Sequence, residues 1–233
     1  MNAFQFPPGW VFADKYEIIS RLGAGFEGEV YLTREKDTGI ERAAKFFFPS
    51  QNVRNEAAKR HAQKLFKIRS CPTIMQYHTH EKITYRKEQV TCVISEYVEG
   101  EMLSTYMDKH KRLHHFQALQ LLLALTIGLQ PIHMIGEYHG DLHDHNIFIK
   151  PVGAGYQVKL IDVIDWRDSR LENMKKDVSD LIRIFYDIMG GNQYYHEHPP
   201  QIKRICCGLK TTLIHKRFRN ATMLRDFIEN LEW

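Results

Sequence analysis

The chain has 233 residues, of which 43% are hydrophobic and 26% are charged, and its formal net charge is +4 with histidine neutral. These values are typical of a globular protein with one or two domains. The weak positive balance, without a long run of one sign, does not indicate nucleic-acid binding. No apolar run approaches the ~18 residues that a membrane-spanning helix needs, so no membrane insertion is predicted.

Residues 1–8 lack the basic start and the apolar core of a secretory signal. The four cysteines are Cys71, Cys92, Cys206 and Cys207, and the adjacent last two are poorly placed to bridge each other. Reduced thiols are therefore favoured, and they indicate an intracellular, cytoplasmic location.

The first chemical motif is a glycine-rich turn between two predicted strands. Residues 16–22 alternate like a strand, and the pattern G-x-G-x-x-G-x-V that begins at Gly23 leads into a second β-prone run, 29–33. A hairpin with so little side chain lets backbone N–H groups approach phosphate oxygens. A dinucleotide-binding fold is disfavoured, because it needs a helix after the glycines.

The third predicted strand, 42–48, carries Lys45 among apolar residues, where an unpaired lysine is costly. Behind a glycine-rich turn, a lysine that reaches nucleotide phosphates is favoured over an edge-facing one. Such a lysine needs a carboxylate to fix it. The next predicted helix runs from Ser50, as its N-cap, to Ile68, and Glu56 is the carboxylate that it offers, early in its length.

Two more strands, 74–86 and 89–95, are predicted before the chain becomes mainly helical. The predicted later elements are helices at 103–110, 115–135, 177–189, 199–215 and 221–231, and a hairpin that pairs 147–150 with 157–161.

The candidate catalytic segment is the loop 139–146, HGDLHDHN, between a long helix and a strand. It places a carboxylate, Asp141, five residues before a carboxamide, Asn146. Phosphoryl transfer needs such a pair, because one group orients the attacking hydroxyl and the other holds magnesium against the phosphates. A second metal carboxylate is predicted at Asp162, which ends the apolar strand, with Asp165 as its rival. The plainer alternatives are a polar loop and a His-x-His metal site.

The order H-x-D-x-x-x-x-N, apolar strand, Asp, with the glycine-rich turn and the strand lysine upstream, resembles the catalytic core of the protein kinase superfamily. The resemblance runs from about Tyr16 to the end of the chain. It implies an α+β, bilobal fold in a single kinase domain, 1–233. The small antiparallel β N-terminal lobe with one C-helix would span about 11–97, the hinge about 96–100, and the mainly helical C-terminal lobe about 101–233.

The resemblance also implies roles for individual residues. Asp141 would be the catalytic base, Lys45 with Glu56 would clamp the phosphates of ATP, and Asn146 with Asp162 would bind Mg²⁺. The implied nucleotide-binding residues are Leu22, Gly23, Ala24, Gly25, Phe26, Glu27, Gly28, Val30, Ala43, Lys45, Ser95, Glu96, Val98, Asn146 and Asp162.

Four of these positions have a specific place relative to the adenine. Ala43 would lie beneath it, Ser95 would guard the back pocket, and backbone groups near Glu96 and Val98 would bond its edge. The resemblance further implies that Asp177 braces the catalytic loop, although a carboxylate at a helix start is also favoured by the helix dipole.

Departures from the family pattern concern the phosphoacceptor. Gly140 replaces the arginine of H-R-D, His143 replaces the lysine of Ser/Thr protein kinases, and D-F-G reads D-V-I from Asp162. Fourteen residues separate Asp162 from Asp177, which is short for an activation and peptide-docking segment. The amino-acid sequence of the catalytic loop, beginning H-G-D-L-H at His139, is closer to that of aminoglycoside-type phosphotransferases.

Three functions follow, in this order. The first is a compact Ser/Thr-type protein kinase, the second a small-molecule kinase of the aminoglycoside-phosphotransferase type, and the third a nucleotide-binding pseudokinase scaffold. All the charged catalytic groups are present, which argues against the third. We expect ATP and Mg²⁺ as cofactors, a protein or small-molecule acceptor, no nucleic-acid partner, and a monomer as the default.

Overall fold

The computed structural model describes residues 3–232 and divides the chain into two compact units. The first unit contains the chain up to Ser70 and the segment Met75–Val98. The second unit contains Cys71–Ile74 and the chain from Glu99 onward. The chain leaves the first unit inside the segment that the sequence predicts as a hinge.

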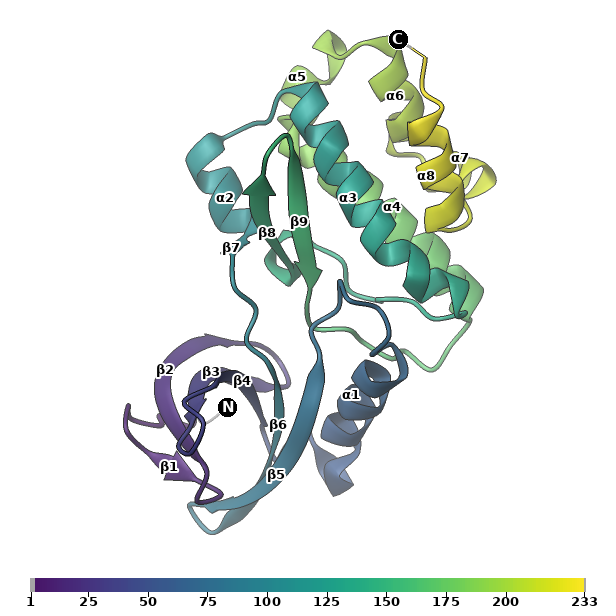
Figure 1. The fold of residues 1–233 in the computed structure, drawn as a ribbon. Helices are drawn as coiled ribbons and strands as arrows, with labels where there is room; N and C mark the ends of the chain where they lie inside the picture. The colour runs from purple at the N-terminus through teal and green to yellow at the C-terminus, as the bar shows by residue number, and fades with distance from the viewer. Residues whose placement is uncertain (1–2, 233) are drawn as a thin grey trace. The chain divides into compact units, whose positions relative to one another are not determined.

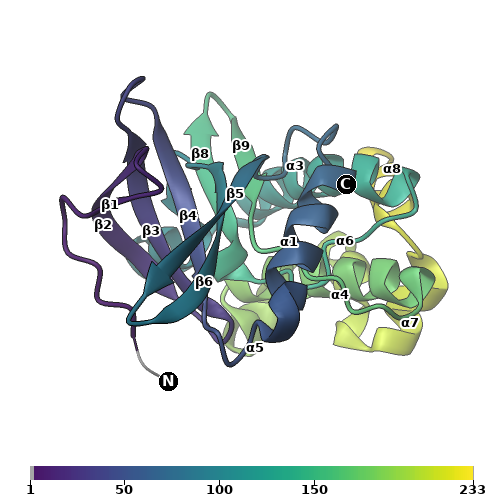
Figure 2. The same ribbon diagram turned by 90° about the horizontal axis from the view of Figure 1, so that it is seen from below.

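The first unit is built on an antiparallel sheet of six strands, in the order β1-β2-β3-β4-β6-β5 (Figure 1). The strands are β1 (Val11–Phe12), β2 (Tyr16–Ala24), β3 (Gly28–Glu35), β4 (Glu41–Phe47), β5 (Tyr77–Tyr85) and β6 (Glu88–Glu96). One α-helix, α1 (Glu56–Lys67), contacts β5 and β6, and Figure 2 shows it beside these strands. This arrangement confirms the predicted β part with one helix.

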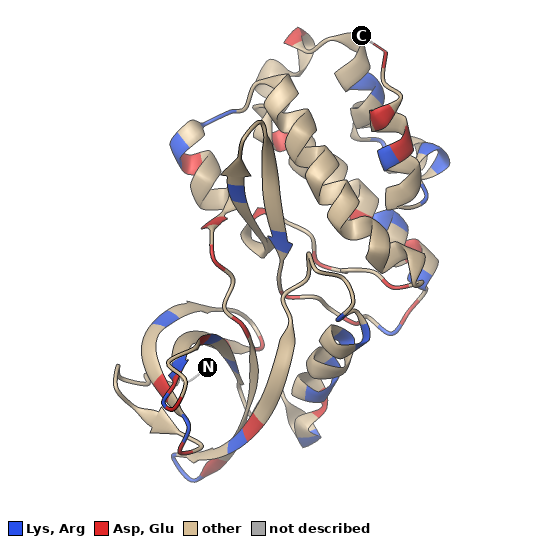
Figure 3. Cartoon of the chain, viewed as in Figure 1, with Lys and Arg blue, Asp and Glu red and all other residues tan. Residues whose placement is uncertain are grey.

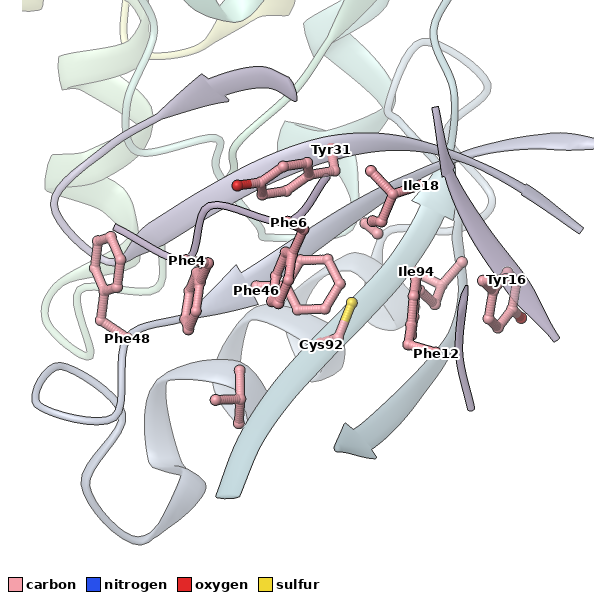
Figure 4. Close-up of a cluster of buried hydrophobic side chains, with 12 residues drawn as sticks. Phe4, Phe6, Phe12, Tyr16, Ile18, Tyr31, Phe46, Phe48, Cys92 and Ile94 are labelled. Carbon is pink, nitrogen blue, oxygen red and sulfur yellow. The ribbon is translucent and has the colours of Figure 1, made fainter. Parts of the chain in front are cut away.

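Aromatic side chains fill the core of the first unit, and some of them come from the N-terminal segment (Figure 4). The rings of Phe4 and Phe6 stack with centroids 5.3 Å apart, and the ring of Phe6 lies 4.6 Å from that of Phe46. The hydroxyl of Tyr85 donates a hydrogen bond to the carbonyl of Phe4. Residues before position 11, where the predicted lobe begins, therefore belong to this core.

The helix α1 begins six residues later than its predicted N-cap, Ser50. Asn55 precedes it in a left-handed conformation, with φ of 64°, and a short 3₁₀ turn, η1 (Val53–Asn55), leads into it. The side chain of Asn52 accepts a hydrogen bond from the backbone N–H of Ala58 at 3.0 Å. The prediction of Ser50 as the cap was wrong, because Asn52 holds the start of the helix from outside it.

Helices dominate the second unit, which confirms the predicted α+β class. They are α2 (Leu103–His110), α3 (His115–Met134), α4 (Arg170–Ile188), α5 (Gly191–Tyr194), α6 (Pro200–Cys206), α7 (Thr211–Arg217) and α8 (Ala221–Glu229), with 3₁₀ turns η2 (Asp144–Asn146), η3 (Tyr195–Glu197) and η4 (Cys207–Leu209). A small sheet, β7-β8-β9, contains β7 (Glu101–Met102), β8 (Ile147–Val152) and β9 (Gly155–Leu160). The strand β9 packs on α3 (Figure 1).

Two predicted helix boundaries differ from the structure. The helix α4 begins at Arg170 rather than 177, because the side chain of Ser169 caps it and accepts from the N–H of Glu172 at 3.4 Å. The predicted helix 199–215 is divided into α6 and α7, because Cys207 and the two residues after it adopt left-handed φ values.

Among residues 3–232, α3 is the helix that is long and apolar enough to cross a membrane by length and composition. Many of its residues are buried within the second unit, as in the core helix of a globular protein.

Candidate active site

The glycine-rich turn connects β2 to β3 in the first unit, and its three glycines have different surroundings. A Cβ on Gly28 would meet the carbonyl oxygen of Phe46 at 2.0 Å, so close packing of β3 on β4 requires glycine there. A Cβ on Gly23 or Gly25 would meet nothing within 4 Å among the described residues. Packing therefore does not account for these two glycines, and the space above them is open to a ligand.

The predicted nucleotide-binding residues of β2 and the turn lie around this open space. Leu22 is 45% exposed and Phe26, at the tip of the turn, is 70% exposed. Ala24 is also exposed, and Val30 is half-buried on β3 opposite Lys45 of β4. The turn thus carries two solvent-exposed apolar side chains next to an open backbone, as a nucleotide-covering loop requires.

Lys45 extends from β4 and lies close to a carboxylate of the glycine-rich turn. Its Nζ is 3.2 Å from Oε2 of Glu27 and 5.3 Å from the centre of the Phe47 ring. Glu56, the predicted partner, is the first residue of α1. Glu27 lies upstream of Lys45, outside the helix in which its carboxylate partner was predicted, so this ion pair was not predicted. The pairing of Lys45 with Glu56 stays a prediction.

The predicted adenine-binding residues lie on neighbouring strands of the first unit. Ala43 of β4 pairs with Ser95 of β6, and both are buried. The Oγ of Ser95 lies 3.3 Å from the sulfur of Met75. Glu96 is tied at both ends to Gln76, since its N–H donates to the Gln76 carbonyl at 2.8 Å and its carboxylate accepts from the Gln76 N–H at 3.0 Å.

Val98 ends the first unit and is buried, with 6% of its surface exposed. No hydrogen bond joins its backbone to another residue within 3–232. The backbone N–H and C=O of Val98 are therefore available for hydrogen bonds to a ligand. A purine edge has the donors and acceptors to form them, which agrees with the predicted place of Val98.

The candidate catalytic loop, 139–146, holds Asp141 and Asn146 in direct contact. The Nδ2 of Asn146 donates to the backbone carbonyl of Asp141 at 2.9 Å and lies 3.2 Å from its Oδ2. His143 lies beside both, with Nε2 3.6 Å from Oδ2 of Asp141 and 2.9 Å from Nδ2 of Asn146. Asn146 is buried, whereas the Asp141 side chain is 39% exposed. The carboxylate is therefore held in place but accessible to an acceptor hydroxyl.

Asp177 braces this loop from inside α4. It is fully buried, and its two oxygens accept from the N–H groups of His139 at 2.7 Å and Gly140 at 2.8 Å. The Nε2 of His133 lies 3.1 Å from the same carboxylate. Asp177 stands eight positions into α4, so its alternative interpretation as a helix-start charge was wrong. His133, the third partner of Asp177, lies 44 positions before it and was not predicted.

The backbone at position 140 requires glycine. Its φ is +90°, and a Cβ there would meet the carbonyl oxygen of Ile164 at 2.7 Å. The indole N–H of Trp166 also donates to the Gly140 carbonyl at 2.8 Å. An arginine, which the family pattern has here, does not fit this backbone.

The two carboxylates after β9 have different environments. Asp162 has a left-handed φ of 55°, which a non-glycine residue rarely adopts and which is often found at functional sites. The N–H of Ile161, just before it, donates to the backbone carbonyl of Asn146 at 3.0 Å. Asp165 instead accepts from the hydroxyl of Tyr138 at 3.2 Å, and burial raises the pKa of Tyr138 to about 12, which keeps this donor protonated. The surroundings favour Asp162 over Asp165 as a metal ligand.

A second group of potential ligands lies in the same loop. One ligand atom from each of His143, Asp144 and His145 lies within 4.8 Å of the others. The plainer His-x-His alternative thus has a geometric basis. Its imidazoles suit zinc-like ions, whereas the oxygen donors of Asn146 and Asp162 suit magnesium.

Comparison with known proteins gives a consistent result. A family model described as the protein kinase domain matches residues 16–163. A serine/threonine-protein kinase of Myxococcus xanthus, pkn2, is 30% identical over 159 residues, which are 67% of this chain and 18% of that protein.

Two plant proteins also match. A putative cyclin-dependent kinase F-2 of Oryza sativa subsp. japonica is 28% identical over 145 residues, 60% of this chain and 44% of the relative. The serine/threonine-protein kinase TIO of Arabidopsis thaliana is 28% identical over 154 residues, 64% of this chain and 11% of the relative. The matched region spans less than half the length of each of these relatives.

Proposed function

Because this chain belongs to the protein kinase domain family and is a kinase-like phosphotransferase, we propose that it transfers the γ-phosphate of ATP, with Mg²⁺, to a hydroxyl group of a protein. The contact between Asp141 and Asn146 carries this proposal, since it couples an accessible carboxylate to a buried amide. Asp141 orients the acceptor hydroxyl and takes up its proton.

Magnesium fits the oxygen atoms that the second unit offers. The amide nitrogen of Asn146 is turned toward Asp141, so its Oδ1 is the atom left to face a cation. The carboxylate of Asp162 would be the other protein ligand. The ion, when bound, neutralises charge on the phosphate oxygens during transfer.

Groups of the first unit would bind ATP. Lys45 carries the positive charge for the phosphates, and the open backbone at Gly23 and Gly25 covers them. Glu27 would release Lys45 to the phosphates, or would share it, when the nucleotide enters. Ala43 and the Val98 backbone would receive the adenine.

A small-molecule acceptor is the second candidate. Since α4 begins at Arg170, only residues 163–169 lie between Asp162 and that helix. So short a segment offers little backbone on which to align a peptide, which favours a compact acceptor. The names of the matched relatives favour a protein acceptor, and we rank that first.

The remaining properties are also proposals. The four cysteines are free thiols, which supports a reducing, cytoplasmic compartment. We propose that the protein acts without nucleic acid or membrane insertion, and as a monomer.

Incubation with γ-labelled ATP and Mg²⁺, with and without generic protein substrates and small-molecule hydroxyl compounds, tests the function directly. We expect label in a protein band, and loss of transfer when EDTA is added. If label were found only in the small-molecule fraction, the acceptor would be a small molecule and not a protein.

The variant Asp141→Asn is the matched control for this assay. It should lower the transfer rate by about 10² to 10⁴, the usual contribution of a general base, while ATP binding stays close to that of the parent protein. A variant that retained near-parental turnover would remove Asp141 from the role of base.

A further inference from the structure

A hollow of about 700 Å³ lies on the second unit, away from the loop that carries Asp141. It is formed by α6, the turn after it, and α7. The residues that line it are Pro200, Lys203, Arg204, Cys207, Leu213, Lys216 and Arg217. Four of these seven side chains are cationic, and none is acidic.

The four cations of this basic hollow have no carboxylate partner within residues 3–232. The Nζ of Lys203 donates to the carbonyl of His196 at 2.8 Å, and Nη1 of Arg217 donates to the carbonyl of Arg204 at 2.6 Å. The guanidinium groups of Arg204 and Arg217 lie 5.4 and 5.5 Å from the centre of the same ring, that of Phe227. Two like charges are thus held at one ring without a counter-charge.

The sequence around the basic hollow explains this charge. Between Glu197 and Asp226 the chain has seven lysines and arginines and no acidic residue. This local excess is larger than the net charge of +4 of the whole protein. Glu197 and Glu229 interact with Arg112 and Arg225, neither of which lines the hollow. Figure 3 shows blue stretches, which mark lysine and arginine, on α6 and α7. The charge of the hollow is therefore available to an acidic ligand.

The lining also indicates the class of ligand. Pro200 and Leu213 add apolar surface, and Leu213 is 48% exposed. Among the described residues, no aromatic side chain lines the hollow, so this lining offers no platform on which single-stranded nucleic acid stacks its bases. A concave site with cations and an aliphatic side chain suits a short peptide that carries both carboxylates and an apolar residue.

We propose that the basic hollow is a docking site for an acidic peptide segment of a protein partner. The carboxylates of the segment bind Lys203, Arg204, Lys216 and Arg217, and an aliphatic side chain of the segment packs on Leu213. The site uses none of the residues assigned to phosphoryl transfer, so docking does not depend on the proposed function.

Fluorescence anisotropy without ATP tests the proposal. The probe is a short fluorescein-labelled peptide of glutamates and leucines, and the comparison peptide has glutamine for each glutamate. At about 0.15 M salt, where distant charges are screened, the acidic peptide should bind saturably and the glutamine peptide should not.

Two charge reversals of exposed lysines in the same segment make a matched pair. Lys216 lines the hollow and makes no hydrogen bond or ion pair to a described residue, whereas Lys210 is exposed outside the lining. Lys216→Glu should weaken binding about tenfold, because an attraction becomes a repulsion at contact distance. Lys210→Glu should change the affinity by no more than about twofold. Circular dichroism of both variants confirms that the fold is kept.

Three results would overturn the proposal. One is equal weakening by the two substitutions, which would mean that only overall charge matters. Another is absence of saturable binding of the acidic peptide to the parent protein. The third is that oligo-dT binds more tightly than the peptide and that Lys216→Glu, but not Lys210→Glu, weakens this binding. That result would assign the hollow to nucleic acid.

Discussion

At the scale of single residues, Gly140 explains a departure from the family pattern. Its backbone carries three constraints at once: a φ of +90°, an N–H that donates to Asp177, and a carbonyl that accepts from Trp166. The loop around Asp141 is therefore held by backbone contacts to buried groups. The arginine that the family pattern H-R-D has at this position would not fit here. Asp177 of α4 holds the loop without it.

We predict that Gly140→Ala destabilises the protein more than Gly153→Ala does. Both glycines have positive φ, but a Cβ on Gly153 meets nothing within 4 Å, whereas one on Gly140 meets the Ile164 carbonyl at 2.7 Å. We expect a loss of about 1 kcal/mol for Gly153→Ala and about 2 to 4 kcal/mol for Gly140→Ala. Urea unfolding of the three proteins measures the difference, and equal losses would show that the clash at Gly140 is relieved without cost.

Residue-level prediction of which side chains meet depends on whether spacing along the chain carries the signal. Asp141 and Asn146 are five residues apart on one loop, and the structure places them in contact. It failed for Glu27, which lies 18 positions before Lys45 and reaches it across the hairpin formed by β3 and β4. Only the pairing of these strands reveals that contact.

At the scale of elements, the position of α1 leaves two carboxylates to consider as partners of Lys45. Glu27 is 3.2 Å away, and Glu56 begins the helix. If Lys45 and Glu56 act as one unit, Lys45→Met and Glu56→Gln should each slow transfer, Glu56→Gln less severely, and the double variant should lose less than the sum.

The same cycle with Glu27→Gln in place of Glu56→Gln serves as the comparison, with single-turnover transfer as the measurement. Suppose that the losses in transfer rate are additive for Lys45 with Glu56 but non-additive for Lys45 with Glu27. That result would make Glu27 of the glycine-rich turn, and not Glu56, the carboxylate that positions Lys45.

The short segment before α4 leads to a prediction about regulation. Ser169, the only Ser or Thr between Asp162 and Asp177, caps α4. Ser169→Ala should therefore reduce stability by about 1 kcal/mol and leave the transfer rate unchanged, and phosphatase treatment should not affect activity. Thermal unfolding and the labelled-ATP assay measure the two effects. Activity that is abolished by the substitution and restored by Ser169→Asp would show that a phosphate is needed.

Helices were predicted well where local signals agree and poorly where side chains outside the helix set the start. The helix α2 has the predicted bounds, Leu103–His110. The start of α4 was missed although the sequence from Ser169 to Glu172 has the S-x-x-E spacing of a capping box. The start of α1 depends on Asn52 and on left-handed residues before the helix, and helix propensity carries no signal for either.

At the scale of the whole molecule, four histidines with lowered pKa values make stability depend on pH. His139 is fully buried, whereas His115 and His198 are half-buried and His78 is exposed. Burial lowers the pKa of His78, His115, His139 and His198 from the ordinary value of 6.5. For His139, the most deeply buried of them, the carboxylates of Asp177, Asp141 and Asp162 oppose this shift without reversing it.

We predict that the free energy of unfolding falls as the pH is lowered below about 7. These histidines bind protons less readily in the folded protein than in the unfolded chain, where they titrate near pH 6.5, so acid favours the unfolded state. Burial raises the pKa of Asp180 and Asp187 from 3.8, an opposite effect that acts in the more acidic range. Urea unfolding at pH 7.5 and pH 6 tests the prediction, and a higher stability at pH 6 would contradict it.

The basic hollow was not predicted from the overall composition or from runs of one charge. Its cations come from α6 and α7, and they meet only because the turn after α6 reverses the chain. The sequence, judged by runs of one sign, contains no sign of it. The absence of acidic residues between Glu197 and Asp226 was the available signal.

The aromatic N-terminal segment has a consequence for synthesis on the ribosome. Phe4 is made early, but the Tyr85 hydroxyl that bonds its carbonyl is 81 positions further along. At a usual translation rate of about 5–20 residues per second, roughly 4–16 s separate the two. Until Tyr85 has been made, Phe4 and Phe6 lack the ring against which both pack, so the first unit becomes complete only when β5 and β6 have emerged from the exit tunnel.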